Sequence, residues 1–278
     1  MQLPVIRCLT RPAWIGALLM TCALDASAAA AAGAACGPYR VGYHALGQLY
    51  GVDAMGRPQG IDKDVLETLA KRSGCTFVTE VDSRVRIWEA IRNGRLDLTT
   101  SVVPTPEREA MGEIVVYKSS RNRLLVRAAR ADELNSMAAF LAKDGVRVVV
   151  VRSFMYSEPF DDWLATLRAQ HKLEEVVDYN TAVRVFAAGR VDAMIVHSAA
   201  EDDVSRAMAE NGGFRAIKVE GAHPFPSGLF ISRRTVSATD RQLLRRTLTE
   251  MVRDGTVERI IKRHQDRSDT DSRAVPPP

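Results

Sequence analysis

The sequence lacks the short motifs that mark several large classes of enzyme. It contains no G-x-S-x-G nucleophile elbow, no H-E-x-x-H metal motif, no P-loop and no G-x-G-x-x-G dinucleotide fingerprint. Its five histidines show no metal-ligand spacing, so we expect neither a metal centre nor a bound cofactor. These absences favour a binding protein over an enzyme.

Long apolar segments are absent beyond the N-terminus. No later segment approaches the roughly 18 uninterrupted apolar residues that a membrane-spanning helix needs. The N-terminus itself has the anatomy of a secretion signal: Arg7 and Arg11 precede the apolar run Trp14–Leu24, and Ala-Ser-Ala at 26–28 fits a cleavage site. We predict that residues 1–28 are a signal peptide and that the mature protein is soluble and periplasmic. A short membrane anchor is the alternative.

Cysteine is scarce, with four residues in the chain. Two fall within the predicted signal peptide, which leaves Cys36 and Cys75 in an oxidising compartment. They precede strands predicted at 39–43 and 76–81, which would be neighbours in a doubly wound lobe. We therefore predict a Cys36–Cys75 disulfide, with two unrelated thiols as the alternative.

Charge of a single sign is not concentrated anywhere in the chain. The formal net charge is +4, and the basic residues are dispersed among acidic ones, so we expect no nucleic-acid partner. The 278 residues, 46% hydrophobic and 26% charged, are enough for two compact soluble lobes of about 100 residues each. We expect the protein to be a monomer.

Strands and helices alternate along the chain, which is typical of a parallel sheet with covering helices. The elements predicted for the first half are strands 39–43, 76–81 and 96–103 and a helix over 61–74, capped by Asp62 and ended by Gly74. The second half repeats this order with strand 146–151, helix 158–171, a helix capped by Asn180 or Thr181, and strand 191–196.

Two short apolar strands, 123–126 and 229–232, would form a two-strand hinge between lobes. We predict that lobe 1 comprises residues 36–125 and 226–265, and that lobe 2 comprises residues 126–225. Helices over 239–254 and 256–264 would pack back on lobe 1. Residues 266–278 are polar, end in three prolines and are predicted to be a disordered tail.

The segment from Ile87 to Arg108 is the most informative part of the chain. An amphipathic stretch ends at Gly94, a buried strand follows, and then comes Thr-Pro-Glu-Arg at 105–108. Threonine is a good N-cap and proline suits the first helical position. Arg108 would lie in the first turn of a helix at the carboxyl end of a strand, where open α/β sheets bind ligands. A guanidinium beside free helix N–H groups suits a carboxylate.

This segment resembles the bacterial solute-binding protein family 3, the amino-acid-type receptors of ABC transporters. The resemblance extends to the Gly-Arg-Pro-Gln-Gly-Ile-Asp-Lys-Asp string at 56–64 and to Gly-Arg-Val-Asp-Ala at 189–193, and covers residues 39–264. It implies an α/β, two-lobed, type II periplasmic-binding-protein-like fold with the ligand between the lobes. The implied partners are a small-molecule ligand and the membrane subunits of an ABC transporter.

The resemblance also implies roles for single residues. The arginine of T-P-E-R holds the ligand's α-carboxylate in this family, which assigns that role to Arg108. Ser101 and Val103 would offer main-chain groups at the strand end. Tyr50 would be an aromatic lid, with a core-edge aromatic as the alternative, and Ser153 would lie in the loop by which lobe 2 binds the ligand.

The largest departure from the family is His197, where amino-acid receptors have an aspartate that pairs with the ligand's α-ammonium. Neutral histidine offers no negative charge, so the ligand would be an organic acid, or an acid elsewhere compensates. A merely structural role for His197 is the alternative. The family also suggests two other functions, a cyclohexadienyl or arogenate dehydratase-like enzyme and a sensor-kinase input domain. We predict a binding protein without enzymatic activity.

Overall fold

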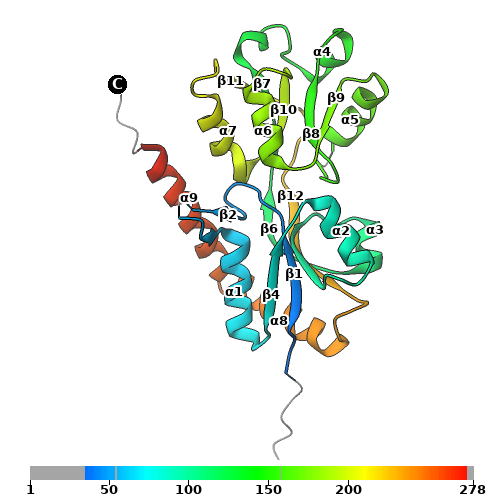
Figure 1. Ribbon diagram of the computed structural model, residues 1–278, viewed down its shortest axis with the longest axis vertical. Helices are drawn as coiled ribbons and strands as arrows, with labels where there is room; N and C mark the ends of the chain where they lie inside the picture. The colour runs from blue at the N-terminus through cyan, green and yellow to red at the C-terminus, as the bar shows by residue number, and fades with distance from the viewer. Residues whose placement is uncertain (1–34, 54, 157, 274–278) are drawn as a thin grey trace, which may run out of the picture. The chain divides into compact units, whose positions relative to one another are not determined.

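Two five-stranded sheets organise the protein. The computed structural model describes residues 35–53, 55–156 and 158–273, with side chains as far as residue 266; the predicted signal peptide lies outside these residues. The first sheet contains, in order, β4 (Phe77–Val81), β1 (Tyr39–Tyr43), β5 (Leu98–Val102), β12 (Phe225–Ser232) and β6 (Gly112–Ser120). The second contains β11 (Phe214–Ile217), β7 (Asn122–Arg127), β10 (Ala193–His197), β8 (Val148–Val151) and β9 (Leu173–Val176). Each sheet forms one α/β lobe, as predicted (Figure 1).

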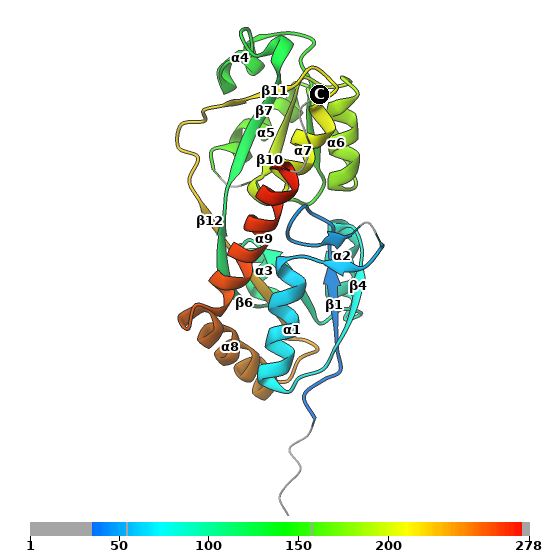
Figure 2. The same cartoon turned by 90° about the vertical axis from the view of Figure 1, so that its left-hand side faces the viewer.

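Lobe 1 has a helix layer on each face of its sheet. One layer contains α1 (Ile61–Ser73), α8 (Ala238–Arg253) and α9 (Thr256–Arg273), which contact one another (Figure 2). The other contains α2 (Arg84–Arg92) and α3 (Pro106–Met111). There Trp88 packs edge-to-face on Phe230, with ring centroids 5.3 Å apart. The strands β1, β4 and β5 are parallel, so their carboxyl ends lie at one edge of the sheet.

Lobe 2 follows the same plan because its interior strand β8 (Val148–Val151) is apolar on both sides. In β8, Val148 and Val150 pack with α4 (Met137–Ala142) and α5 (Phe160–Ala169). Val149 and Val151 face the opposite way and pack with α6 (Tyr179–Ala187) and α7 (Glu201–Met208) (Figure 1). A continuous β-branched run is what a doubly covered parallel strand requires. The remaining elements are the hairpin β2 (Gly51–Val52) and β3 (Pro58–Gln59), and the 3-10 turns η1 (Ala128–Arg130) and η2 (Ser198–Ala200).

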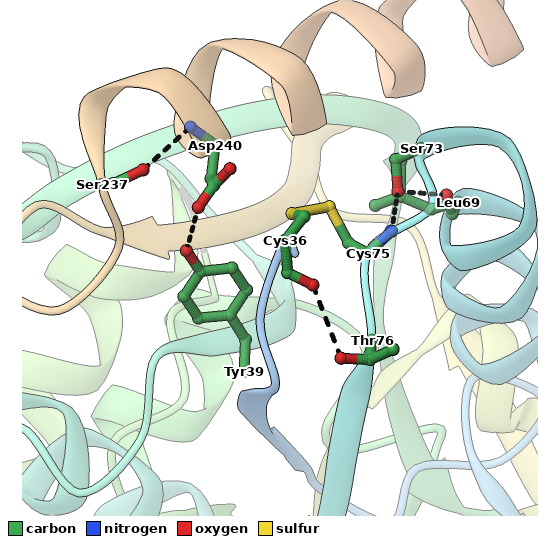
Figure 3. Close-up of a disulfide and its surroundings, with 8 residues drawn as sticks. All are labelled: Cys36, Tyr39, Leu69, Ser73, Cys75, Thr76, Ser237 and Asp240. Carbon is green, nitrogen blue, oxygen red and sulfur yellow. Dashed lines mark hydrogen bonds between the residues drawn. A yellow bond between two sulfur atoms is a disulfide. The ribbon is translucent and has the colours of Figure 1, made fainter. Parts of the chain in front are cut away.

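The predicted disulfide is present. Cys36 and Cys75 are bonded, with their Cα atoms 4.5 Å apart, at the starts of β1 and β4 (Figure 3). These two strands pair in parallel, with Tyr39 opposite Phe77. The Tyr39 hydroxyl also donates to the carboxylate of Asp240 on α8, so the bonded strand ends are attached to the C-terminal helices.

The chain passes between the lobes at two places, as a two-strand hinge requires. It crosses at Arg121, between β6 and β7, and again through residues 218–224, between β11 and β12. The segments predicted for the hinge lie within β7 and β12. At the first crossing the Ser198 N–H donates to the Arg121 carbonyl at 2.9 Å.

Three details differ from the sequence-based expectations. Gly60, rather than Asp62, is the N-cap of α1, because the Asp62 carboxylate is bound by residues of other elements. Asp178 caps α6, accepting from the Thr181 N–H at 2.8 Å, so neither Asn180 nor Thr181 is the cap. The helix α9 continues to Arg273, beyond the predicted start of a disordered tail, because no proline or glycine interrupts it there. No helix in the described part of the chain is long and apolar enough to cross a membrane.

Candidate functional site

The carboxyl-end edge of the first sheet faces lobe 2. The Gln48 N–H, in the loop after β1, donates to the Ala199 carbonyl of lobe 2 at 2.7 Å. The neighbouring Gly47 lies so close that a Cβ atom there would be 2.1 Å from the same oxygen. Residues of both lobes line a cavity of about 480 Å³, which we call the interlobe cavity. Its lining includes His44, Arg84, Arg152, Phe154, Asp178 and Asn180.

Asp62 lies at the centre of a buried network next to this cavity. Its side chain is 1% exposed, and it accepts hydrogen bonds from the hydroxyls of Ser101 and, at 2.5 Å, Tyr117. The ammonium of Lys118 lies 3.6 Å from the carboxylate and donates to the Ser101 hydroxyl at 2.5 Å. Burial lowers the pKa of Lys118, and Asp62 opposes that shift. The charge of Asp62 is therefore neutralised within the protein.

Ser101 is held in this network by its backbone as well as its side chain. Its φ of 54° lies in the left-handed region, which is uncommon for a residue other than glycine. This residue lies next to the last residue of β5, and its carbonyl accepts from Arg84 at 3.2 Å. The predicted site residue Ser101 is thus the junction between the Asp62 network and a second cluster around Arg84.

Arg84 begins α2 and is 6% exposed. It donates to the carbonyls of Thr100 and Ser101, each at 3.2 Å, and its Nη2 lies 3.0 Å from the Nε2 of His44. Arginine can only donate, so His44 Nε2 accepts and the proton of neutral His44 is on Nδ1. That Nδ1 is buried and has no hydrogen-bond partner among the described residues.

The electrostatics of this cluster favour an anion. Burial lowers the pKa of His44 well below its ordinary value, and the charges of Arg84 and Lys118 lower it further, so His44 stays neutral. Burial and the charge of Arg108 lower the pKa of Arg84 to about 9, and Asp62 opposes them. No carboxylate oxygen of the described residues lies within 4.0 Å of the Arg84 guanidinium. Arg84 and Lys118 face one carboxylate, that of Asp62, which leaves one buried positive charge in excess.

Arg108 lies where the sequence predicted. The Thr105 hydroxyl caps α3 by accepting from the Arg108 N–H at 3.3 Å, and Pro106 is in the first turn. The guanidinium lies over the Trp88 ring, 4.8 Å from its centroid, and Nη1 donates to the Val103 carbonyl at 2.9 Å. Burial lowers the pKa of Arg108 to about 10. The Val103 carbonyl, predicted as a ligand contact, is therefore occupied by Arg108 in this structure.

Lobe 2 contributes His197 at the end of β10. Its Nδ1 accepts from the Ala199 N–H at 3.1 Å, so the neutral ring carries its proton on Nε2. The ring packs edge-on against Phe225, with centroids 6.0 Å apart. Burial lowers the pKa of His197 to about 3; Lys118 lowers it further, and Asp62 opposes the shift. His197 is a neutral donor near the Asp62 network.

Two predicted site residues lie elsewhere. Tyr50 stacks on Tyr43, with ring centroids 4.3 Å apart, and is buried in the core of lobe 1. Ser153 follows β8 with a φ of 62° and is exposed. Its neighbour Arg152 lines the interlobe cavity. The structure therefore groups Ser101 and His197 near the Asp62 network, and leaves Tyr50 and Ser153 outside it.

Sequence reasoning missed most of the buried polar cluster. The sequence pattern indicates only a helix cap at Asp62 and gives no role to Arg84, Tyr117 or Lys118. A charged residue near the end of a buried strand, such as Lys118 in β6, is a signal that could have been used. Within the described part of the chain, no group of three or more metal-ligating side chains could hold an ion.

The two α/β lobes, the paired crossings and the polar cavity between them define a two-lobed solute-binding protein. The chain belongs to the bacterial extracellular solute-binding proteins, family 3, whose model matches residues 40–266. This confirms the resemblance noted in the sequence. No curated protein matched the chain.

Solved structures agree with this fold. The chain is similar to an ancestral arginine-binding protein bound to arginine, at 20% identity and a TM-score of 0.70, covering 83% of this chain and 99% of that one. It is also similar to AncCDT-1, an ancestral amino-acid-binding protein and precursor of cyclohexadienyl dehydratase. The identity is 22% and the TM-score is 0.66, covering 81% of this chain and 94% of that one. A histidine kinase sensor domain with similarity to periplasmic binding proteins is similar at 16% identity and a TM-score of 0.65, covering 82% of this chain and 96% of that one. At these identities the likeness establishes the fold alone.

Proposed function

We propose that this protein is a periplasmic receptor that captures a small carboxylate-bearing ligand, an amino acid or a related organic acid, for an ABC transporter. The observation that carries the proposal is the excess of positive charge beside the interlobe cavity. Arg84 lines the cavity, and Arg108 is held near it through the Val103 carbonyl, two residues from the Ser101 carbonyl that Arg84 binds. Neither arginine has a carboxylate partner within 4.0 Å among the described residues, whereas Lys118 is neutralised by Asp62. A buried cation without a counter-charge is costly, and a bound carboxylate would supply one.

Arg108 is the proposed anchor for the ligand's carboxylate. Only Nη1 donates to a protein acceptor in the described contacts, so the other guanidinium N–H groups are available for a forked interaction. The short helix that begins at Pro106 sets the position of the arginine, because its N-cap at Thr105 fixes the first turn.

Capture would be coupled to closure of the lobes about the two crossing segments. The contact between Gln48 and Ala199 joins the two lobes, and closure would exclude water from the bound carboxylate. A transporter would then bind the closed, monomeric receptor.

The test is isothermal calorimetry on protein that has been unfolded and refolded to remove any co-purified ligand. Amino acids, polyamines and organic acids are titrated. We expect carboxylates to bind, and Arg108→Ala to weaken them by about 2–5 kcal/mol, the usual loss for a buried charge-assisted pair. Arg168→Ala, which removes an exposed arginine on α5, is the matched control.

Binding of polyamines alone would contradict the proposal, and unchanged affinity in Arg108→Ala would contradict the assignment of that residue. The alternative of a dehydratase-like enzyme is tested on the same samples. A receptor returns its ligand chemically unchanged after long incubation, as measured by NMR, whereas a dehydratase converts it.

A further inference from the structure

Arg84 and His44 form a second candidate anion position that the proposed anchor at Arg108 does not use. Both side chains are more than nine-tenths buried, with relative exposures of 6% and 4%. Both line the interlobe cavity. They come from different segments, the first turn of α2 and the loop that follows β1, and meet through the 3.0 Å contact between Arg84 Nη2 and His44 Nε2.

The hydrogen-bonding inventory of this pair requires an acceptor. His44 uses its lone pair on Arg84, so its remaining nitrogen, Nδ1, is a donor, and it has no partner among the described residues. Arg84 donates only to carbonyl, hydroxyl and imidazole acceptors and to no carboxylate. An unpaired buried donor beside an unneutralised cation is the arrangement that a carboxylate would satisfy.

The acids near the cavity are already engaged. Asp82 accepts from the Arg86 guanidinium and, at 2.6 Å, from the Ser83 N–H. Asp178 accepts from both the N–H and the hydroxyl of Thr181, at 2.8 and 2.9 Å. Asp62 is bound by Tyr117, Ser101 and Lys118. A ligand ammonium would therefore have to displace an existing partner to find a counter-charge.

We propose that the ligand carries two acidic groups and no ammonium, with one carboxylate on Arg108 and the second on the Arg84–His44 pair. This inference rests on the proposed function and names its ligand class. Arg84 donates to the Ser101 carbonyl at 3.2 Å and Arg108 donates to the Val103 carbonyl at 2.9 Å, so both guanidiniums lie at the same end of β5. A compact diacid would span the two arginines and relieve their mutual repulsion. The neutral Nε2–H of His197 adds a donor from lobe 2, which suits a ligand made of acceptors.

The experiment compares diacids with monoacids of the same chain length by calorimetry on the refolded, full mature protein. Malonate, succinate, glutarate and adipate are titrated beside propionate, butyrate, valerate and hexanoate, with aspartate and glutamate as diacids that carry an ammonium. We expect the best diacid to bind at least about 30-fold tighter than its monoacid, the lower end of the gain from one further buried charge pair. It should also bind tighter than the matching amino acid.

Two variants test whether the tighter binding of diacids depends on Arg84 and His44. Arg84→Met and His44→Phe should each reduce the diacid-to-monoacid ratio to below about threefold. Arg168→Met, on α5 with an exposed guanidinium bound to Glu175, controls for the loss of one positive charge and should retain most of the ratio. If Arg84→Met does not fold, the His44 Nδ1–H signal in ¹⁵N NMR of the wild type decides, because succinate should shift it and butyrate should not.

The outcomes separate the two proposals. Equal binding of monoacids and diacids, dependent on Arg108, overturns this inference and leaves the proposed function standing. Glutamate binding as tight as glutarate overturns the exclusion of an ammonium. Failure of every carboxylate to bind overturns the proposed function, and this inference with it.

Discussion

Replacing Asp62 with asparagine should destabilise the protein strongly, because it leaves Lys118 buried without a counter-charge. The two side chains are 1% and 4% exposed, and the carboxylate lies 3.6 Å from the ammonium. Asparagine keeps the shape of aspartate but not its charge, and its amide nitrogen cannot accept the hydrogen bonds that the second carboxylate oxygen accepts. The change therefore isolates the contribution of the charge.

Breaking a buried ion pair by removing one partner typically costs about 3–5 kcal/mol. For a chain of this size each kcal/mol lowers the melting temperature by roughly 2–4 °C, so we expect a fall of roughly 6–20 °C. The cost is bounded because burial already lowers the pKa of Lys118, and the stranded ammonium can lose its proton. The variant should accordingly regain stability, relative to the wild type, as the pH rises.

The assay is urea denaturation of the wild type, Asp62→Asn, Lys118→Met and the double variant. The double variant should be more stable than Asp62→Asn, because it removes the stranded cation, and the cycle should give a coupling energy above about 1 kcal/mol. Asp132→Asn, which breaks an exposed pair with Arg215, should cost less than about 1 kcal/mol. A loss of that small size in Asp62→Asn, with no coupling to Lys118, would refute the reasoning.

Three further perturbations test other parts of the structure. Serine at Cys36 and Cys75, which are 39 residues apart, should lower the free energy of unfolding by about 4 kcal/mol through loop entropy; an unchanged urea midpoint would contradict this. The pKa of His197 is about 3 in the folded protein and about 6.5 when unfolded. The unfolded chain therefore binds the extra proton, so the free energy of unfolding should fall as the pH drops from about 6.5 towards 3. The fall should be less steep in His197→Asn, and equal pH dependence in the two proteins would exclude a contribution from His197. Gly47→Ala places a Cβ 2.1 Å from the Ala199 carbonyl and should weaken ligand affinity by hindering closure, whereas wild-type affinity would show that this contact is dispensable.

The parts of the fold that could be predicted are those decided by local chemistry. The run Val148–Val151 is apolar on both sides, which a doubly covered strand requires, and it is fully buried. The start of α3 is predictable from Thr105 and Pro106 alone, because threonine is a good N-cap and proline suits the first helical position. The disulfide followed from parallel pairing of the two strands that its cysteines precede. In each case a short segment, or a single pairing rule, contains the information.

The cluster around Arg84 could not be predicted in this way, because local helix preferences already account for each of its residues. Nothing in the local sequence indicates that these residues contact one another. Asp62 in the first turn of α1 is favourable for the helix dipole, so a capping role explains it without any tertiary contact. Arg84 follows the N-cap Ser83 and looks like an ordinary surface residue of an amphipathic helix. Its burial depends on the position of α2 against the end of β5, which is a property of the assembled lobe.

The consequence of having histidine at position 197 can be judged only from the assembled cluster. From the sequence alone, the missing aspartate left open whether another acid compensates for it. In the structure Asp62 is neutralised by Lys118, and Asp82 and Asp178 are bound to neighbours in their own segments. An ammonium would thus meet a neutral histidine on one side and an excess of cations on the other. On the diacid proposal, the same groups would attract a second carboxylate, so the histidine that disfavours an amino acid would favour a diacid.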